Sequence, residues 1–358
     1  MCGILSRPIR AALSASHVRF QPWTYQLSGV LVERVEAIWS SELSPADGEA
    51  YDEFVAVARG GHYSQTRRWA KPATTGRPFV ARYFLARRQG RVVGAALILK
   101  TRVLNAVTLP FVQTERGPVV DDPEVLPEVL DSLVYQARSH GILRLSVMPY
   151  WAGEDKSQVE RMLRRARFAD AQSFHGRHAR TLRLDLSGLS ADDLFAGSAL
   201  SQVRQNVRRA QRAGAVVRPG QKCDMDAVRA MHKQLLHASR HPGAAWYEAL
   251  AEYFQSCGAM FVCEHQGEVI SAIFVARHGE LATYALGFSS ADDVRFPKMI
   301  LPLASAIAWA KENGVKCFDL GGIPLEHDAD VKRASIAEFK RSFSRAEISL
   351  VREHAHWL

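Results

Sequence analysis

The sequence predicts an α+β protein built from two tandem domains, each with a mixed, partly antiparallel central sheet flanked by helices. Two observations carry this prediction. A strand–turn–strand unit occurs twice, and a helix–glycine–strand unit follows each copy at nearly the same offset. Repeated units in one order indicate a duplicated domain. The length agrees with this prediction, because a chain of 358 residues is too long for a single hydrophobic core of ordinary size and suits two domains.

The first repeated unit is a pair of apolar segments joined by a Gln-Gly dipeptide. It reads FLARRQGRVVGAALIL over residues 84–99 and FVCEHQGEVISAIFVA over residues 261–276. Apolar residues alternate on both sides of the dipeptide, which predicts an antiparallel hairpin with a tight turn. Because hairpins of this kind are common, the likeness alone leaves chance resemblance as an alternative.

The second repeated unit covers residues 126–147 and residues 300–322. Each copy has an amphipathic helical pattern, a glycine stop (Gly141 or Gly314) and an apolar strand. A helix that crosses between strands predicts parallel pairing at that end of the sheet. The expected parts are an N-terminal extension over residues 1–45, a first domain over 46–185, a second domain over 186–335, and a C-terminal segment over 336–358 that returns to the cleft between the domains.

Composition narrows the class of protein. The chain is 47% hydrophobic and 23% charged, as is usual for a globular protein, and residues 92–99 form its longest strongly apolar run. That run is too short to span a bilayer, and no signal peptide is evident. Five scattered cysteines without a C-x-x-C pair predict neither a zinc site nor a disulfide framework, so we expect a cytoplasmic protein without a metal.

The net charge of +9 suggests a polyanionic partner: nucleic acid, a nucleotide-linked substrate or an anionic membrane surface. An arginine-rich segment over residues 201–217 is the clearest basic feature. It begins at Ser201, a predicted N-cap, and carries Arg204, Arg208 and Arg212 on one helical face, with Arg209 nearby. Such a face suits phosphates, and a solvated helix surface is the alternative.

Two further segments carry candidate polar groups. In TERGPVVDD (114–122), Asp121 suits proton acceptance or amine binding, whereas Asp122-Pro123 also reads as the start of the next helix. In MHKQLLHASRHPGAAWYEAL (231–250), Arg240 lies near the aromatic pair Trp246-Tyr247 and suits a substrate phosphate. The histidines there match no H-E-x-x-H pattern, so no metal site is expected.

The most informative stretch is CFDLGGI (317–323) followed by EFKRSF (338–343). Two adjacent glycines, Gly321 and Gly322, allow close backbone approach or a turn that a side chain would block. Lys340 lies between apolar residues, which suggests a positive charge at a defined place. The alternatives are a simple tight turn and a surface lysine.

Together these segments resemble the FemABX family of aminoacyl-tRNA-dependent transferases, which build peptidoglycan cross-bridges. The resemblance runs from about Gly60 to Arg345 through GGHYSQTRRWA, RGPVVDD, the arginine-rich helix, TYALGFSS, FDLGGIP and EFKRSF, in the family's order. It implies two tandem acyltransferase domains of the GNAT type. The chain has no inserted helical arm and so looks like the compact form. It also has Ser344-Arg345 where the family often has glycine.

The resemblance implies roles for matching residues. Phe339 and Lys340 fall on the family's Phe-Lys pair, which contacts the tRNA acceptor end and the reacting ester, and the backbone around Gly321-Gly322 is expected to help stabilise the charge. The arginine face of residues 201–212 is expected to bind tRNA phosphates.

On the acceptor side, the resemblance places Asp121 near the acceptor amine. Lys71 and Arg240 match residues that bind acceptor phosphate, Tyr284 matches a tyrosine that lines the acceptor cleft, and Tyr247 is a looser match in the same region.

The implied reaction transfers an aminoacyl group from aminoacyl-tRNA to an amine of a peptidoglycan precursor or a related small molecule, without a cofactor. The acceptor is a nucleotide- or lipid-linked muropeptide or a small molecule, with peripheral membrane contact where it is lipid-linked. One alternative is an N-acyltransferase that uses acetyl-CoA or another acyl-CoA. It usually needs a glycine-containing pyrophosphate loop, [RQ]-x-x-G-x-[GA], before a crossover helix, and neither helix has one. The other is a non-catalytic RNA-binding protein.

Overall fold

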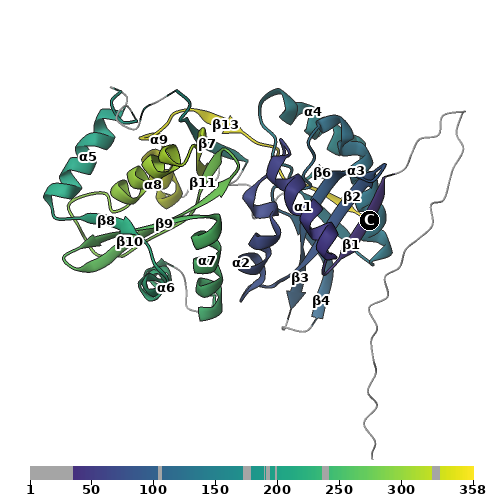
Figure 1. Cartoon of the computed structure of the whole chain (residues 1–358), viewed down its shortest axis with the longest axis horizontal. Helices are drawn as coiled ribbons and strands as arrows, with labels where there is room; N and C mark the ends of the chain where they lie inside the picture. The colour runs from purple at the N-terminus through teal and green to yellow at the C-terminus, as the bar shows by residue number, and fades with distance from the viewer. Residues whose placement is uncertain are drawn as a thin grey trace, which may run out of the picture. The chain divides into compact units, whose positions relative to one another are not determined.

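The computed structural model describes residues 35–103, 107–171, 179–188, 190, 194–197, 200–235, 242–324 and 331–358. In this part of the chain two seven-stranded mixed sheets, each flanked by helices, form the α+β architecture that the sequence predicts (Figure 1). We call the sheet that contains β1 to β6, with its helices, the first half, and the sheet that contains β7 to β13, with its helices, the second half.

The first half is assembled mainly from the N-terminal part of the described chain. Its elements are β1 (Glu36–Ser40), α1 (Pro45–Val57), α2 (Ala70–Thr74), β2 (Phe79–Arg88), β3 (Arg91–Val103), β4 (Val107–Thr114), α3 (Leu126–Ser139), β5 (Arg144–Val147), α4 (Gly153–Arg165) and β6 (Ala169–Asp170). The strand order in this sheet is β1-β2-β3-β4-β5-β14-β6. Its main core lies between the sheet and α3, where Leu126, Leu130 and Leu133 are fully buried.

The second half repeats this plan. Its elements are β7 (Arg180–Asp185), α5 (Ser201–Arg212), β8 (Val216–Pro219), α6 (Met225–Leu235), α7 (Ala244–Cys257), β9 (Gly258–His265), β10 (Glu268–His278), β11 (Leu281–Ser289), α8 (Ile300–Glu312), β12 (Cys317–Gly322), α9 (Val331–Arg341) and β13 (Glu347–Ser349); β14 (His354–Trp357) follows. The strand order is β13-β7-β12-β11-β10-β9-β8. The apolar helix α8 packs against this sheet as α3 does against the first.

The two hairpins confirm the predicted repeat. The turn residues Gln89 and Gly90 have φ values of 51° and 75°, and Gln266 and Gly267 have 55° and 84°. Two consecutive positive φ values define the turn that suits the right-handed twist of a hairpin. Each hairpin leads to a strand that pairs in parallel with the strand after the helix, β4 with β5 and β11 with β12.

The first strand of the second sheet and the last described strand of the chain pair with distant segments. β7 lies between β12 and β13 of the second sheet, although it precedes the expected boundary between residues 185 and 186. β14 pairs with β5 and β6 of the first sheet, so the last described segment runs from the second half into the first (Figure 1). Residues 336–358 thus supply part of α9, a strand of the second sheet and a strand of the first.

Candidate functional site

The diglycine at the end of β12 adopts a backbone that requires glycine. Gly321 has a φ of 78°, in the left-handed region that residues with side chains rarely occupy. A Cβ atom at this position would lie 2.9 Å from the backbone oxygen of Tyr284 and 3.4 Å from Nζ of Lys340. Gly321 therefore lets β12 pass close to both β11 and the lysine.

Lys340 is buried against this turn. Its side chain comes from the last turn of α9 and is only 8% exposed. Nζ donates a hydrogen bond of 2.9 Å to the backbone oxygen of Gly322 and lies 5.3 Å from the ring centroid of Tyr284. Burial lowers the pKa of Lys340 to about 8, and the negative charge of Asp319 partly opposes that shift. The lysine is thus a desolvated positive charge at a fixed place and not a surface residue.

Asp319 is a second buried charge in the same strand. Its side chain is 3% exposed, and its Oδ1 accepts hydrogen bonds from the backbone N–H of Gly321, at 2.7 Å, and from the hydroxyl of Thr181. Oδ2 accepts a hydrogen bond of 3.0 Å from the hydroxyl of Tyr150. Nε of Arg183 lies 3.6 Å from the same oxygen. All these groups are donors, so the buried carboxylate oxygens have hydrogen-bond partners.

Tyr150 is the residue of the first half that contacts Asp319. It lies just after β5, and its hydroxyl accepts a hydrogen bond of 2.7 Å from Nη2 of Arg183 while donating to Asp319. Burial, and then the charge of Asp319, raise the pKa of Tyr150 above its usual range, so it remains a protonated donor. The guanidinium groups of Arg116 and Arg183 lie 5.4 Å and 5.3 Å from its ring centroid, and the ring of His62 lies 4.6 Å away.

The structure therefore brings together four of the predicted residues: Lys340, Tyr284, Gly321 and Gly322. Phe339 precedes the lysine on α9, packs against the core of the second half, and has its ring centroid 5.6 Å from that of Phe343. Lys340 thus carries its amino group at the diglycine.

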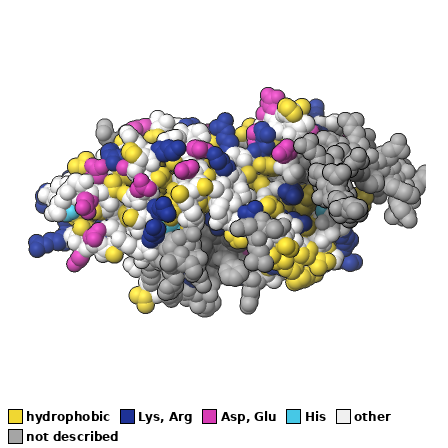
Figure 2. Space-filling view, turned by 90° about the horizontal axis from the view of Figure 1, so that it is seen from below, with side chains coloured by type: hydrophobic (Ala, Val, Ile, Leu, Met, Phe, Trp, Pro, Cys, Tyr) yellow, Lys and Arg dark blue, Asp and Glu magenta, His cyan; other side chains and the backbone are white. Residues whose placement is uncertain are grey.

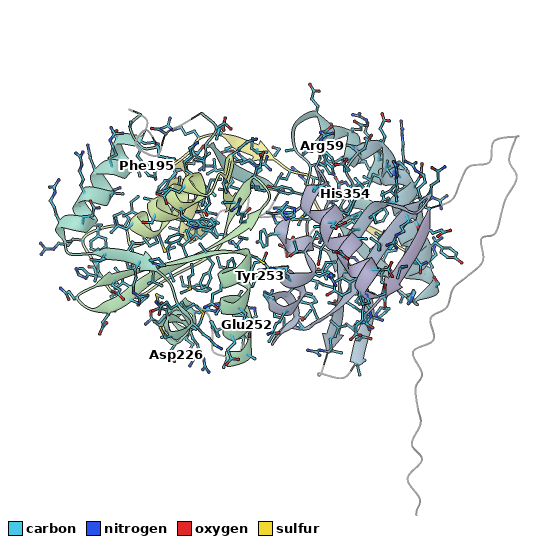
Figure 3. All side chains as sticks on the ribbon, in the orientation of Figure 1. Arg59, Phe195, Asp226, Glu252, Tyr253 and His354 are labelled. Carbon is cyan, nitrogen blue, oxygen red and sulfur yellow. The ribbon has the colours of Figure 1, made fainter. Side chains whose placement is uncertain are left out.

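Asp121 belongs to the first half, between β4 and the short 3₁₀ helix that precedes α3. It is exposed, and its Oδ1 accepts a hydrogen bond of 2.9 Å from the backbone N–H of Arg59, a first-half residue labelled in Figure 3. Its neighbour Asp122 caps the short 3₁₀ helix Pro123–Val125 through the N–H of Glu124, at 2.9 Å. The alternative of a helix-capping acid thus holds for Asp122, whereas Asp121 accepts from the backbone of Arg59.

Two other predicted acceptor residues lie on α2 and α7, two helices that contact each other. Lys71 on α2 forms an exposed ion pair with Glu252 of α7, which is labelled in Figure 3. Tyr247 is buried in the core beside α6, and its hydroxyl lies 2.9 Å from Nδ1 of His232. Arg240 lies outside the described residues.

The arginines of α5 divide into two kinds. Arg204 donates hydrogen bonds to the backbone oxygens of Phe195, labelled in Figure 3, and of Gly197, the latter at 2.6 Å. Arg208, Arg209 and Arg212 are exposed. The helix begins at Ser201 as predicted, but Leu200 rather than Ser201 is its N-cap and no side chain caps it, so the expectation of a serine cap was wrong.

Basic side chains are mixed with other kinds on one face of the molecule. On the described part of the face seen in Figure 2, Lys and Arg side chains are interspersed with acidic and apolar ones. On this face the positive charge is therefore distributed, and a basic surface for an anionic partner has to be sought on individual elements such as α5.

Sequence reasoning missed the residues that support the lysine: Asp319, Tyr150, Arg183 and Thr181. One signal was available, because an aspartate inside the apolar strand CFDLGG must find donors if it is buried. Nothing in the sequence indicated that one donor would come from Tyr150, 169 positions earlier.

In the part of the chain that the structure describes, no group of three or more His, Cys, Asp or Glu side chains is arranged to hold a metal ion. None of the described helices combines the length and apolar character needed to cross a membrane.

Comparison with known proteins gives consistent relatives. The model of the FemAB family matches residues 47–263, and that of a GNAT-type acetyltransferase domain matches residues 197–341. The fold is similar to the crystal structure of FemX, with a TM-score of 0.68 and 17% identity, over 90% of this chain and 97% of that one. No curated protein matches the sequence.

Two other solved structures share the fold. The C-terminal domain of an Agrobacterium fabrum protein designated a lysylphosphatidylglycerol synthetase is 17% identical, with a TM-score of 0.54, over 87% of this chain and 91% of that one. A tandem GNAT protein from the clavulanic acid biosynthesis pathway is 11% identical, also with a TM-score of 0.54, over 90% and 98%. Both halves of the chain thus have the GNAT-like fold that the sequence predicted.

Proposed function

The chain belongs to the FemAB family, and we propose that it is an acyltransferase that moves an aminoacyl group from an aminoacyl-tRNA to an amine. The observation that carries this proposal is the buried ammonium group of Lys340, held 2.9 Å from the Gly322 oxygen at the diglycine turn. A preorganised positive charge in a desolvated site stabilises the negative charge that develops at a carbonyl oxygen during acyl transfer.

The proposed reaction needs no covalent enzyme intermediate. The acceptor amine attacks the ester carbonyl, so a C–N bond forms and the C–O bond to the terminal ribose of the tRNA breaks. The amine loses a proton and the ribose oxygen gains one. Because an ester is already activated, positioning of the two substrates supplies much of the rate enhancement.

In this scheme Lys340 stabilises the negative charge that develops on the carbonyl or ribose oxygen. Phe339 contacts the acceptor end of the tRNA, and Asp121 orients or deprotonates the amine. The exposed arginines of α5 (Arg208, Arg209 and Arg212) bind tRNA phosphates. Arg204 is less suited to that task, because it is engaged with the Phe195 and Gly197 oxygens.

The acceptor is proposed as an amine of a peptidoglycan precursor or of a related small molecule, and the reaction as cytoplasmic, without a cofactor. Lys71, Tyr284, Tyr247 and Arg240 are the proposed acceptor-binding residues. One structural neighbour is designated a lysylphosphatidylglycerol synthetase, so the fold is also associated with an aminoacylated lipid, and a lipid-linked acceptor belongs in the test set.

A second candidate is an acyl-CoA-dependent N-acyltransferase, which the match to an acetyltransferase domain over residues 197–341 favours. The loop before α8 argues against it. It carries Asp292 and Asp293, and Nζ of Lys298 is occupied by the backbone oxygens of Ser290 and Asp292, at 2.5 and 2.6 Å. A pyrophosphate needs free N–H groups and little negative charge at such a place.

The deciding experiment incubates the purified protein with a tRNA pool charged with labelled amino acids and with candidate amines. We expect label to move into a ribonuclease-resistant product that depends on the added amine. Acylation from acetyl-CoA with none from charged tRNA would favour the second candidate. Binding of tRNA without transfer to any acceptor would indicate a non-catalytic RNA-binding protein.

A further inference from the structure

Asp319 is a buried carboxylate that the proposed chemistry does not use directly. Its side chain is 3% exposed, in the last strand before the diglycine. Removing a charge from water is costly unless several donors compensate it, and here a backbone N–H, two hydroxyls and a nearby guanidinium do so. This number of donors around one side chain indicates that Asp319 does more than stabilise β12.

One oxygen of Asp319 is connected to the lysine through the diglycine. Oδ1 accepts a hydrogen bond of 2.7 Å from the N–H of Gly321. The backbone oxygen of the next residue, Gly322, accepts a hydrogen bond of 2.9 Å from Nζ of Lys340. Gly321, with its left-handed φ, thus lies between the contact with the carboxylate and the contact with the ammonium. The carboxylate thus fixes the turn that holds the lysine.

The other oxygen faces the first half. Oδ2 accepts the hydroxyl of Tyr150, which is itself fixed by the hydrogen bond from Arg183 at 2.7 Å. Tyr150 follows β5, whereas Asp319 and Arg183 belong to β12 and β7 of the second sheet. A single carboxylate therefore touches the first half with one oxygen and the lysine-bearing turn with the other.

We propose that Asp319 is the positioning residue for Lys340, and that Tyr150 completes it from the first half, so that the lysine is held at the diglycine only while the two halves are in contact. This inference deepens the proposed function and rests on it for its catalytic meaning, but the link from Asp319 to Lys340 can be measured without any substrate.

The groups around Lys340 determine what a pH titration of this lysine measures. Asp319 on β12 is the carboxylate that acts on it, and Tyr284 on β11 presents its ring. On α9, Arg341 pairs with Glu338 at 2.7 Å and with Glu347 of β13 at 2.9 Å. Glu347 also pairs with Arg180 of β7, so the two positive and two negative charges compensate one another. Because Asp319 favours the charged form of the lysine, its replacement by a neutral residue must move the titration of Lys340 to lower pH.

The first test follows that titration by NMR of protein labelled at the lysine ε-carbons, with the Lys340 signal assigned from Lys340→Arg. Asp319→Asn is expected to lower the titration midpoint of Lys340 relative to the unmodified protein. Asp224→Asn is the matched control, because Asp224 is also buried in the second half but pairs with Arg218. An unchanged midpoint in Asp319→Asn would overturn the proposal.

The second test uses variants that keep the Asp319 charge. Tyr150→Phe and Thr181→Val each remove one hydroxyl donor, and Thr181→Ser restores the donor at position 181. We expect kcat to fall by about tenfold in the first two, which corresponds to about 1.4 kcal/mol of lost transition-state stabilisation, and to recover in Thr181→Ser. Relative to the unmodified protein, the pH at which activity falls should be lower in Asp319→Asn and unchanged in Tyr150→Phe.

These outcomes separate the two proposals. If Asp319→Asn does not fold, Tyr150→Phe decides, because an unchanged kcat in that variant contradicts a link between the halves. If the unmodified protein transfers no aminoacyl group, the proposed function fails, while the NMR titration still tests whether Asp319 acts on Lys340.

Discussion

At the scale of single residues, the site depends on a lysine that the protein partly desolvates. Lys340→Ala removes the positive charge proposed to meet the developing oxyanion, so we expect kcat to fall about 10²- to 10³-fold with little change in the thermal unfolding midpoint. Lys316→Ala is the matched control, because Lys316 is exposed in the same half and pairs with Glu280. Steady-state kinetics with charged tRNA measure both, and full activity in Lys340→Ala would remove the lysine from the mechanism.

The pH dependence follows from the same residue. Burial lowers the pKa of Lys340 to about 8, and the proposed role needs the protonated form. Activity should therefore be retained below that pH and decline as pH rises through it, in a range where an ordinary lysine stays charged. Single-turnover rates corrected for spontaneous ester hydrolysis measure this. A rise in activity over the same range would instead assign the neutral amine as a base.

At the scale of elements, helix α5 carries one arginine that is bonded to the backbone, Arg204, and three arginines that are exposed. Replacing Arg208, Arg209 and Arg212 by glutamine should weaken tRNA binding and reduce the slope of log K against log salt by about 0.7–0.9 for each phosphate that the helix no longer neutralises. Arg204→Gln should mainly lower thermal stability, because it frees the Phe195 and Gly197 oxygens. Filter binding across a salt series distinguishes them, and equal slopes in all variants would contradict α5 as a tRNA surface.

The elements also show what could be predicted from sequence. The two hairpins and the helices α3 and α8 are encoded locally, by alternation, helical periodicity and glycine stops, so they were predicted correctly. The partners of β7 and β14 depend on pairing between distant segments, which no local pattern encodes. The same limit applies in the site: Gly321, Gly322 and Lys340 lie in recognisable motifs, whereas the contact of Tyr150 with Asp319 exists only in the folded chain.

At the scale of the whole molecule, the first half depends on a strand that follows the second half in the sequence. β14 pairs with β5 through four residues and with β6 through two, and His354, labelled in Figure 3, is fully buried between them. A chain ending at Arg352 should lose on the order of 4 kcal/mol of folding free energy, from these hydrogen bonds and the buried side chains. Trp357→Ala, which keeps β14 and changes an exposed side chain, is the control. Thermal denaturation of the truncated chain at the unmodified midpoint would show that β14 is dispensable.

The placement of β14 also sets an order of events during synthesis. The strands of the second sheet follow one another in the sequence. In contrast, β14, which pairs with β5 and β6, is translated about 200 residues after them, or roughly 10–40 s later at ordinary translation rates. Over that interval the nascent first half presents unpaired strand edges, which are prone to pair with other chains. The half made first is therefore the one completed last, and its yield in the cell should depend on how well chaperones shield it until the ribosome has passed residue 357.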